Sequence, residues 1–142
     1  MKLRLGMSPI SWSNDDLPQL GGETSLQTCL VETREAGFTG TETGGKFPKD
    51  AAALSAVLGA HDLALVSGWY SGTLINNSLE EELERIAEQL ALFKKCGASV
   101  IVYGETYETV QNRQERPLSS RPKLEDFDVA AYGRRLTMLA EH

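Results

Sequence analysis

The fold is decided by residues 63–105, LALVSGWYSGTLINNSLEEELERIAEQLALFKKCGASVIVYGE. The stretch opens at residues 63–67 with an apolar run that is typical of a strand buried on both faces. Ser78 and Glu81 then have the spacing of a capping box, which starts a helix. Apolar side chains recur after it at helical intervals until Gly97 stops the helix, and a second strand follows. This order predicts two parallel strands joined by a helix.

The rest of the chain repeats the same alternation. Thr24 and Gln27 have the spacing of another capping box, and Asp50 is placed to cap a further helix. We expect the other strands and helices, in turn, at residues 2–7, 24–36, 38–43, 50–61 and from about 127 onward. Four consecutive βα units predict an α/β fold with a parallel sheet whose strand order follows the chain order.

Two architectures contain four such units: a small open α/β sheet, and the first half of a TIM barrel of about 250 residues. The expected connections after the strands are long, for example residues 8–23 and 104–125, whereas those before the strands are short. A TIM barrel carries its active site on the loops that follow its strands. We therefore predict that residues 1–142 form the N-terminal half of a single TIM (β/α)8 barrel domain. Its unpaired strand edges are expected to make the chain dimerise or aggregate.

The composition argues against several classes of protein. With 41% hydrophobic and 24% charged residues among 142, the chain is neither disordered nor fibrous. Its net charge of −6 comes without a basic stripe, which argues against a nucleic-acid partner. No apolar run approaches the ~18 residues of a membrane span, and a secretory apolar segment is not visible. Cys29 and Cys96 are expected to be buried free thiols, and the chain is expected to be cytoplasmic.

Aromatic side chains gather at the ends of the expected strands and in the loops that follow them. Trp12, Trp69 and Tyr70 are the main examples. Their rings are suited to stacking on the apolar face of a sugar or cyclitol, with their polar atoms reaching hydroxyl groups. The alternative is that they pack the top of the barrel. Asn14 is interpreted either as part of a polar pocket rim or as a turn residue.

Two carboxylates end expected strands: Glu42 ends the second strand within TETGGK, and Glu105 ends the fourth strand after Tyr103-Gly104. Such side chains act as an acid or a base, or bind substrate hydroxyls. The alternative is a carboxylate satisfied by backbone N–H groups. Lys46 is placed to reach back over the site. The Gly44-Gly45-Lys46 segment lacks the full pattern of a phosphate-binding loop and is a weak signal for one.

A metal site is not visible in the sequence. The acidic residues 80, 81, 82 and 84 are predicted to be a solvated helix start, where the helix dipole favours negative charge. Only two histidines exist: His61 is expected on the face opposite the strand-end loops, and His142 is the last residue.

Several stretches together carry a resemblance to one family. They are GMSPISWSNDDLPQLGG (residues 6–22), GFTGTETGGKFP (37–48), LALVSGWYSG (63–72), RPLSSRPKL (116–124) and YGRRLTMLAEH (132–142). The SWSNDD and GGKFP segments, in this order and at this separation, are the most specific. The chain resembles the N-terminal half of inosose dehydratase (2-keto-myo-inositol dehydratase), within the xylose-isomerase-like TIM-barrel superfamily.

The resemblance implies a lyase of inositol catabolism with a small cyclitol substrate. Such an enzyme removes water from 2-keto-myo-inositol to give a trihydroxycyclohexanedione by metal-assisted enolisation. The resemblance implies a divalent metal, manganese or cobalt, whose acidic and histidine ligands come after residue 142. It places on this half a substrate-facing rim, in which we expect catalytic Lys46 and Glu42 and substrate-binding Trp12, Asn14, Trp69, Tyr70 and Glu105.

Two alternatives stay open. A sugar isomerase or epimerase of the same superfamily would share the enolisation step but keep the β-hydroxyl. A non-catalytic half-barrel would bind a polyol or a partner chain. Because the metal ligands are expected outside it, the 142-residue chain alone is expected to be inactive until the other half is supplied.

Overall fold

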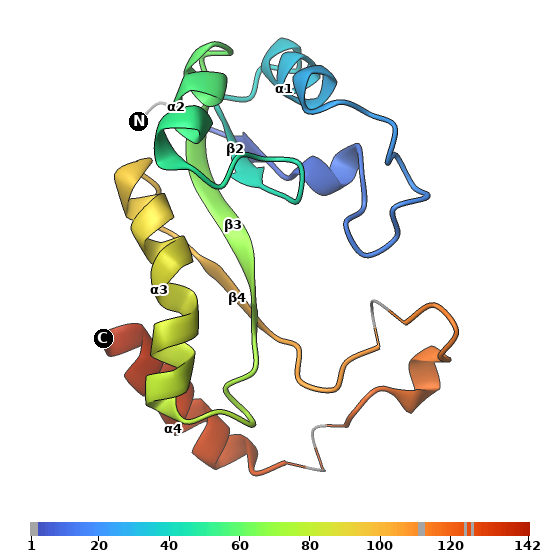
Figure 1. Cartoon of the computed structure of the whole chain (residues 1–142), viewed down its shortest axis with the longest axis vertical. Helices are drawn as coiled ribbons and strands as arrows, with labels where there is room; N and C mark the ends of the chain where they lie inside the picture. The colour runs from blue at the N-terminus through green and yellow to red at the C-terminus, as the bar shows by residue number, and fades with distance from the viewer. Residues whose placement is uncertain (1–2, 111–112, 124, 126) are drawn as a thin grey trace. The chain divides into compact units, whose positions relative to one another are not determined.

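The computed structural model describes residues 3–110, 113–123, 125 and 127–142, and it alternates strands with helices along the chain (Figure 1). Two short 3-10 helices, η1 and η2, lie in the loops after the first and last strands. The elements are β1 (Gly6–Met7), η1 (Pro9–Ser11), α1 (Leu26–Glu35), β2 (Gly40–Thr43), α2 (Ala51–Gly59), β3 (Ala64–Gly72), α3 (Leu79–Lys95), β4 (Val102–Glu105), η2 (Leu118–Ser120) and α4 (Val129–Glu141).

The four strands form one sheet in the order β1-β2-β3-β4. β1 pairs with β2 in parallel, and β2 pairs with β3 in parallel. The predicted sequence of βα units and the predicted strand order are therefore confirmed. The carboxyl ends of parallel strands share one edge of a sheet, so the loops that follow the strands begin at that edge.

The helix starts show how local sequence sets the element bounds. The Asp50 side chain accepts a hydrogen bond from the backbone N–H of Ala53 and caps α2 as predicted. The Ser78 and Glu81 side chains form the predicted capping box at the start of α3. The cap of α1 differs from the prediction. It is Ser25, one residue later than Thr24, and its hydroxyl accepts from the N–H of Thr28.

The pairing of β2 with β3 contains a register shift. Thr41 lies opposite Leu65, but Glu42 lies opposite Ser67, so Val66 is an extra residue on β3. Such a bulge reverses the side on which the following residues emerge.

The reversal is visible in the burial of β3. The odd-numbered Leu65 and Ser67 are buried, whereas the buried residues beyond Ser67 are the even-numbered Gly68, Tyr70 and Gly72. Trp69 therefore emerges on the other side, and 55% of its surface is exposed. The strand also runs five residues beyond the predicted end at Ser67.

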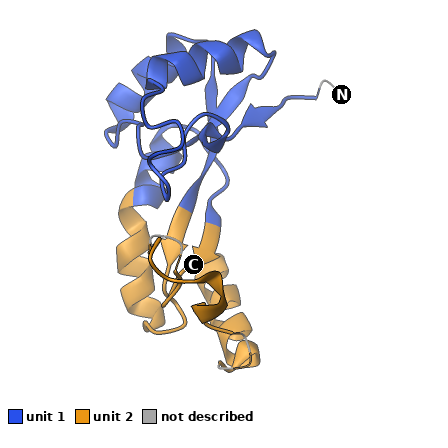
Figure 2. Cartoon of the chain, turned by 90° about the vertical axis from the view of Figure 1, so that its right-hand side faces the viewer, with its two compact units in different colours: residues 1–69, 89–102 blue, residues 70–88, 103–142 orange. Residues whose placement is uncertain are grey.

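The chain divides into two compact units (Figure 2). Unit 1 comprises residues 1–69 and 89–102, and unit 2 comprises residues 70–88 and 103–142. The hydrophobic core of unit 1 is built from apolar side chains of α1, α2, β3, α3 and the β2–α2 turn. Its buried members are Leu30, Phe47, Leu54, Leu58, Leu63, Leu65 and Phe93.

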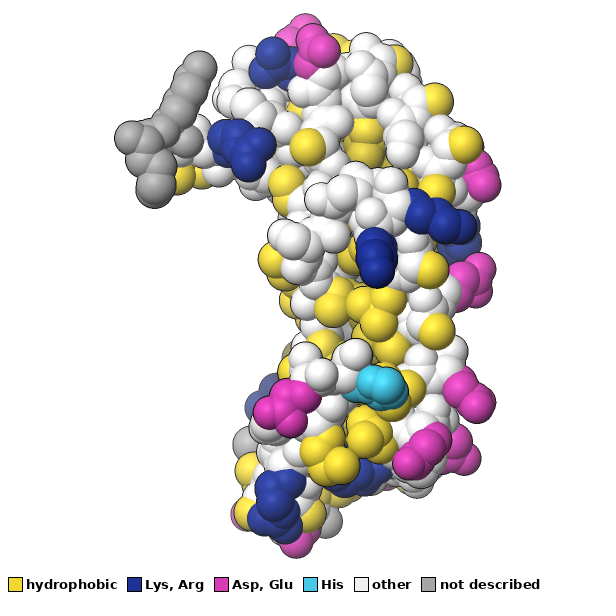
Figure 3. Space-filling view, turned by 90° about the vertical axis from the view of Figure 1, so that its left-hand side faces the viewer, with side chains coloured by type: hydrophobic (Ala, Val, Ile, Leu, Met, Phe, Trp, Pro, Cys, Tyr) yellow, Lys and Arg dark blue, Asp and Glu magenta, His cyan; other side chains and the backbone are white. Residues whose placement is uncertain are grey.

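The surface is mixed in character. On the face drawn in Figure 3, acidic and basic side chains are interspersed, and apolar side chains lie between them. Cys29 is buried and Cys96 is half-buried, and both are free thiols. Among the residues that the structure describes, no helix is both long enough and apolar enough to cross a lipid bilayer.

Candidate functional site

The β1–α1 loop of unit 1, residues 12–25, is tied to the turn that follows β2. The Asp15 carboxylate accepts a hydrogen bond of 2.7 Å from the backbone N–H of Gly45. A carboxylate of the chain itself thus binds the Gly44-Gly45-Lys46 turn, whose sequence is a weak signal for phosphate binding. Asn14 organises the same loop, because its side-chain oxygen accepts from the N–H groups of Asp16 at 2.9 Å and Leu17 at 3.1 Å. This is an Asx turn, the second of the two interpretations of Asn14.

Lys46 extends from this turn to the β1–α1 loop. Its ammonium donates to the backbone carbonyl oxygens of Gly21 at 3.1 Å, Gly22 at 3.0 Å and Thr24. An ammonium has three N–H donors, so these three acceptors use all of them. The side chain therefore holds the loop, and any action of Lys46 on a substrate in this arrangement is through its charge.

Glu42 lies near the end of β2 and is half-buried. One of its carboxylate oxygens accepts a hydrogen bond of 2.6 Å from the Ser67 hydroxyl on β3. The bulge on β3 creates this contact because it places Ser67, rather than Val66, opposite Glu42. The sequence did not single out Ser67, since a serine at the end of an apolar strand carries no local signal for such a partner.

The two predicted tryptophans have different surroundings within unit 1. Trp12 is half-buried, and its indole N–H donates to the carboxylate of Glu32 on α1. Trp69 is largely exposed, and its backbone carbonyl accepts from the side-chain amide of Gln89 at 3.0 Å. Trp69 thus presents an accessible ring, whereas the polar edge of Trp12 is already bound to the protein.

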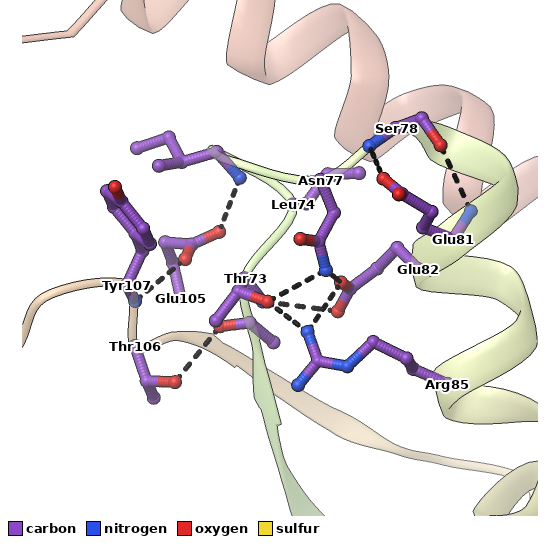
Figure 4. A network of polar contacts seen from close by, with 12 residues as sticks. Thr73, Leu74, Asn77, Ser78, Glu81, Glu82, Arg85, Glu105, Thr106 and Tyr107 are labelled. Atoms are coloured by element: carbon purple, nitrogen blue, oxygen red, sulfur yellow. Dashed lines mark hydrogen bonds and ion pairs between the residues drawn. The ribbon is translucent and has the colours of Figure 1, made fainter.

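Unit 2 contains a polar network centred on Glu82, drawn in Figure 4. Glu82 belongs to the acidic run that was predicted to be solvated, and for this residue the prediction is wrong because its side chain is fully buried. One carboxylate oxygen accepts from the N–H of Thr73 at 3.2 Å and from the hydroxyl of Tyr103 at 3.0 Å. The other accepts from the amide of Asn77 at 2.9 Å and from Arg85 at 3.3 Å. These four donors balance the cost of burying the charge.

Glu105 binds the backbone in the same unit, which is the alternative given above for a strand-end carboxylate. One oxygen accepts from the N–H of Ile75 at 3.1 Å and the other from the N–H of Tyr107 at 3.0 Å (Figure 4). The Tyr103 hydroxyl accepts from the N–H of Leu74 at 3.2 Å. With the Glu82 contact to Thr73, three consecutive N–H groups of the β3–α3 loop are bound by three side chains.

Three tyrosines of unit 2, Tyr70, Tyr103 and Tyr132, lie in environments that favour their neutral form. Burial is the largest cause of the raised pKa of Tyr103, and hydrogen bonding to Glu82 adds to it. Burial and the neighbouring Glu105 carboxylate raise the pKa of Tyr132 to about 12. Tyr70, which is 8% exposed, also has a raised pKa through burial and the charge of Glu82. Its ring packs against that of Tyr103 with 5.6 Å between centroids.

The seven predicted site residues thus fall into two groups. Unit 1 holds Glu42, with a side-chain partner, and the exposed ring of Trp69. The other five have protein contacts or burial that account for them structurally; they are Trp12, Asn14, Lys46, Tyr70 and Glu105. Within the described part of the chain, no three His, Cys, Asp or Glu side chains come together to hold a metal ion.

Comparison with known proteins gives relatives over nearly the whole chain. The rhizopine catabolism protein MocC of Rhizobium meliloti is 44% identical over 141 residues, which is 99% of this chain and 43% of the relative. The inosose dehydratase of Geobacillus thermodenitrificans is 36% identical over 135 residues, 93% of this chain and 45% of the relative. The chain is a relative of the inosose dehydratases. It spans less than half the length of the curated relatives it matches. No protein-family model matches it.

A solved structure supports the fold. The apo form of the 3-keto-D-glucoside 4-epimerase YcjR from E. coli matches with a TM-score of 0.53 and 19% sequence identity, over 99% of this chain and 52% of that one. This likeness confirms the prediction that the chain has the fold of half a TIM barrel.

Proposed function

We propose that the chain supplies half of a lyase that removes water from 2-keto-myo-inositol, the reaction inferred from its resemblance to inosose dehydratases. The observation that carries the proposal is the 36% identity to an inosose dehydratase over 93% of this chain. The same segment is 44% identical to a rhizopine catabolism protein. A small cyclitol substrate and an active site shared with a second half of the barrel follow from the same proposal.

The reaction requires acid–base groups at the end of the strands. A ketone acidifies the C–H bond on the neighbouring carbon, so a base removes that proton and leaves an enolate. The enolate then expels the β-hydroxyl, which leaves as water after protonation. The resulting enol tautomerises to the second ketone. The product therefore differs from the substrate by the loss of one water.

Within this proposal, the chain's residues have distinct parts. Glu42 is the candidate for proton transfer, since its carboxylate accepts a hydrogen bond from the Ser67 hydroxyl, whose proton is exchangeable. Lys46 contributes positive charge while its N–H groups hold the β1–α1 loop. Trp69 offers its exposed ring face to the cyclitol. Of the other predicted rim residues, Trp12 and Asn14 shape the β1–α1 loop of unit 1, and Tyr70 and Glu105 hold structure within unit 2.

The divalent metal, manganese or cobalt, does not fit a site among the described residues of this chain. Their carboxylates and histidines form no cluster of three, whereas an ion of this class needs several converging oxygen or nitrogen ligands. We therefore assign no step of the reaction to a metal held by these residues. Metal ligation by the rest of the barrel stays a prediction from the resemblance.

The proposal is tested by complementation. The chain is incubated with 2-keto-myo-inositol and manganese or cobalt, alone and together with the remaining part of the Geobacillus thermodenitrificans relative. Dione absorbance reports dehydration, and proton NMR in D2O reports exchange beside the ketone. The expected result is no product from the chain alone, turnover by the mixture, and its loss in Glu42→Gln but not in the exposed Glu23→Gln.

Each other outcome contradicts part of the proposal. Turnover by the purified chain alone shows that it needs no second half. Proton exchange with retention of the β-hydroxyl indicates an isomerase or epimerase. Cyclitol binding by the mixture without exchange indicates the non-catalytic half-barrel.

A further inference from the structure

Three backbone carbonyls of unit 1 converge on one ammonium. The oxygens of Gly21, Gly22 and Thr24 all accept from the Nζ atom of Lys46. These residues precede α1, which begins at Leu26, so their carbonyls lie outside the helix. A cation surrounded by carbonyl oxygens is a binding arrangement for an ammonium group, and here the ion belongs to the chain itself.

The loop is shaped so that these carbonyls can approach one another. Gly21 has φ +74°, and a Cβ added to it would lie 1.7 Å from the carbonyl oxygen of Trp12. A Cβ on Gly22 would lie 2.3 Å from the carbonyl oxygen of Pro18. Only glycine fits at either position without a rearrangement of the backbone. The Gly-Gly pair thus folds the loop tightly enough to bring its oxygens to one point.

The contact of the Lys46 ammonium with the β1–α1 loop is accompanied by a contact between a negatively charged side chain of that loop and the turn after β2. Lys46, on the turn after β2, donates to the β1–α1 loop, and Asp15, on that loop, accepts from the N–H of Gly45 on the turn. Each of the two segments therefore contributes one charged side chain that forms hydrogen bonds with the backbone of the other. Trp12 and Asn14 lie on the loop that this exchange holds.

We propose that the carbonyl oxygens of Gly21, Gly22 and Thr24 form a site for a primary ammonium ion, which Lys46 fills in the intact chain. Lys46 is then a positioning residue for the β1–α1 loop. When its side chain is shortened, the site takes up a free alkylammonium ion, because such an ion carries the same three N–H donors. The inference concerns the loop alone and does not depend on the proposed reaction.

The experiment uses the two tryptophans of the chain. Trp69→Phe leaves Trp12 as the only tryptophan, so its fluorescence reports on the loop. In this background we compare Lys46→Ala, Lys46→Met and the exposed control Lys49→Met. Both Lys46 variants are expected to shift Trp12 emission to longer wavelength and to lower the Tm by about 5 °C, whereas Lys49→Met changes neither.

Chemical rescue then identifies the site. Propylammonium chloride is expected to restore the emission and Tm of Lys46→Ala in a saturable way, because it replaces the missing stem and ammonium. Tetramethylammonium chloride has the same charge but no N–H donor, and it is expected to restore nothing. Lys46→Met, whose side chain fills the space, is expected to stay unrestored. Equal effects of the two salts, or Lys46 variants that match Lys49→Met, would overturn the proposal.

A measurement on the unmodified chain covers the case in which the variants do not fold. Selective 15N labelling of lysine is expected to give one ammonium signal whose protons exchange slowly with water, as three hydrogen bonds require. With 13C introduced as well, the signal is assigned to Lys46 by through-bond correlations along its side chain to its own backbone atoms. A Lys46 ammonium that exchanges as fast as the other lysines would overturn the proposal.

Discussion

The two units hold their strand-following loops with side chains of opposite charge. In unit 1 a cation, Lys46, donates to three carbonyls of the β1–α1 loop. In unit 2 two anions, Glu82 and Glu105, accept from the N–H groups of Thr73 and Ile75 in the β3–α3 loop. Both arrangements satisfy backbone groups that a loop leaves unpaired. A loop can thus be held through either its donors or its acceptors.

The difference between them lies in burial. Lys46 is half-buried, so water can replace part of its hydrogen bonding when its contacts with the loop are broken. Glu82 is fully buried, so water cannot take its place as the acceptor for its four donors. The comparison indicates that the anionic network of unit 2 is the more costly to disturb, because a buried polar group left unpaired carries its full desolvation cost.

The largest effect is expected for Glu82→Gln. The amide keeps the size of the side chain but loses the charge and one acceptor, so the N–H of Thr73, the Tyr103 hydroxyl or Arg85 is left without its partner. Urea denaturation is expected to give a free energy of unfolding lower by about 3 kcal/mol. The matched control is Glu84→Gln, an exposed residue two positions on, with a change within about 0.5 kcal/mol. Equal effects would show that the buried network adds nothing.

A smaller loss is expected for Glu105→Gln. The half-buried amide can still accept from one of its two N–H partners, Ile75 or Tyr107. One lost hydrogen bond lowers the free energy of unfolding by about 1–2 kcal/mol. Amide hydrogen exchange is expected to accelerate at one of these two residues, while the exposed Glu115→Gln leaves both unchanged. Unchanged protection at both amides contradicts the assignment of Glu105 to the loop.

Asp15→Ala tests an anionic contact of the same kind at an exposed position of unit 1. Water can replace the lost carboxylate at the N–H of Gly45, so the free energy of unfolding is expected to fall by only about 1 kcal/mol. The neighbouring Asp16→Ala is the control and is expected to show less. If Asp15→Ala costs as much as Glu82→Gln, burial does not explain the difference between the units.

The smallest effect appears only in alkali and concerns Tyr132. Its pKa is raised from 10.0 to about 12 in the folded chain, so the folded state holds this proton more tightly than the unfolded state does. Its contribution to stability is complete below pH 10.0 and is lost as the pH rises toward about 12. In Tyr132→Phe, the urea midpoint is expected to fall less steeply over this range. An unchanged slope would contradict the burial of the Tyr132 hydroxyl and its proximity to Glu105, the two causes of its raised pKa.

Much of the fold follows from periodic patterns that each segment carries by itself. Asp50 and the Ser78–Glu81 pair fix helix starts through contacts within three residues, and such contacts are visible in the sequence. The cap of α1 shifts from Thr24 to Ser25 because adjacent residues are both suited to the role. The structure uses the Thr24 carbonyl for Lys46, 22 positions away, and no local pattern signals that.

The sites were harder to predict because they depend on long-range partners. Glu82 lies in a run of four acidic residues and has the same chemistry as its exposed neighbours. A signal was present, since Glu82 is four residues before the buried Ile86 and shares its helix face. Lys46 lies in the turn after β2 and Glu105 ends β4, as the sequence predicts. The carbonyl partners of Lys46 and the Ile75 N–H that Glu105 binds lie in loops far away in the sequence, which no local pattern signals.

The extra residue on β3 has a consequence for anyone who redesigns this scaffold. Val66 is the unpaired residue, and the buried positions are odd-numbered up to Ser67 and even-numbered from Gly68 onward. Deleting it would let Leu65 and Ser67 follow each other opposite Thr41 and Glu42 in a regular ladder, so the residues after Ser67, Trp69 and Tyr70 included, would keep their sides of the sheet. Libraries and grafts that span this position therefore need two separate patterning schemes, with the change of scheme between residues 67 and 68.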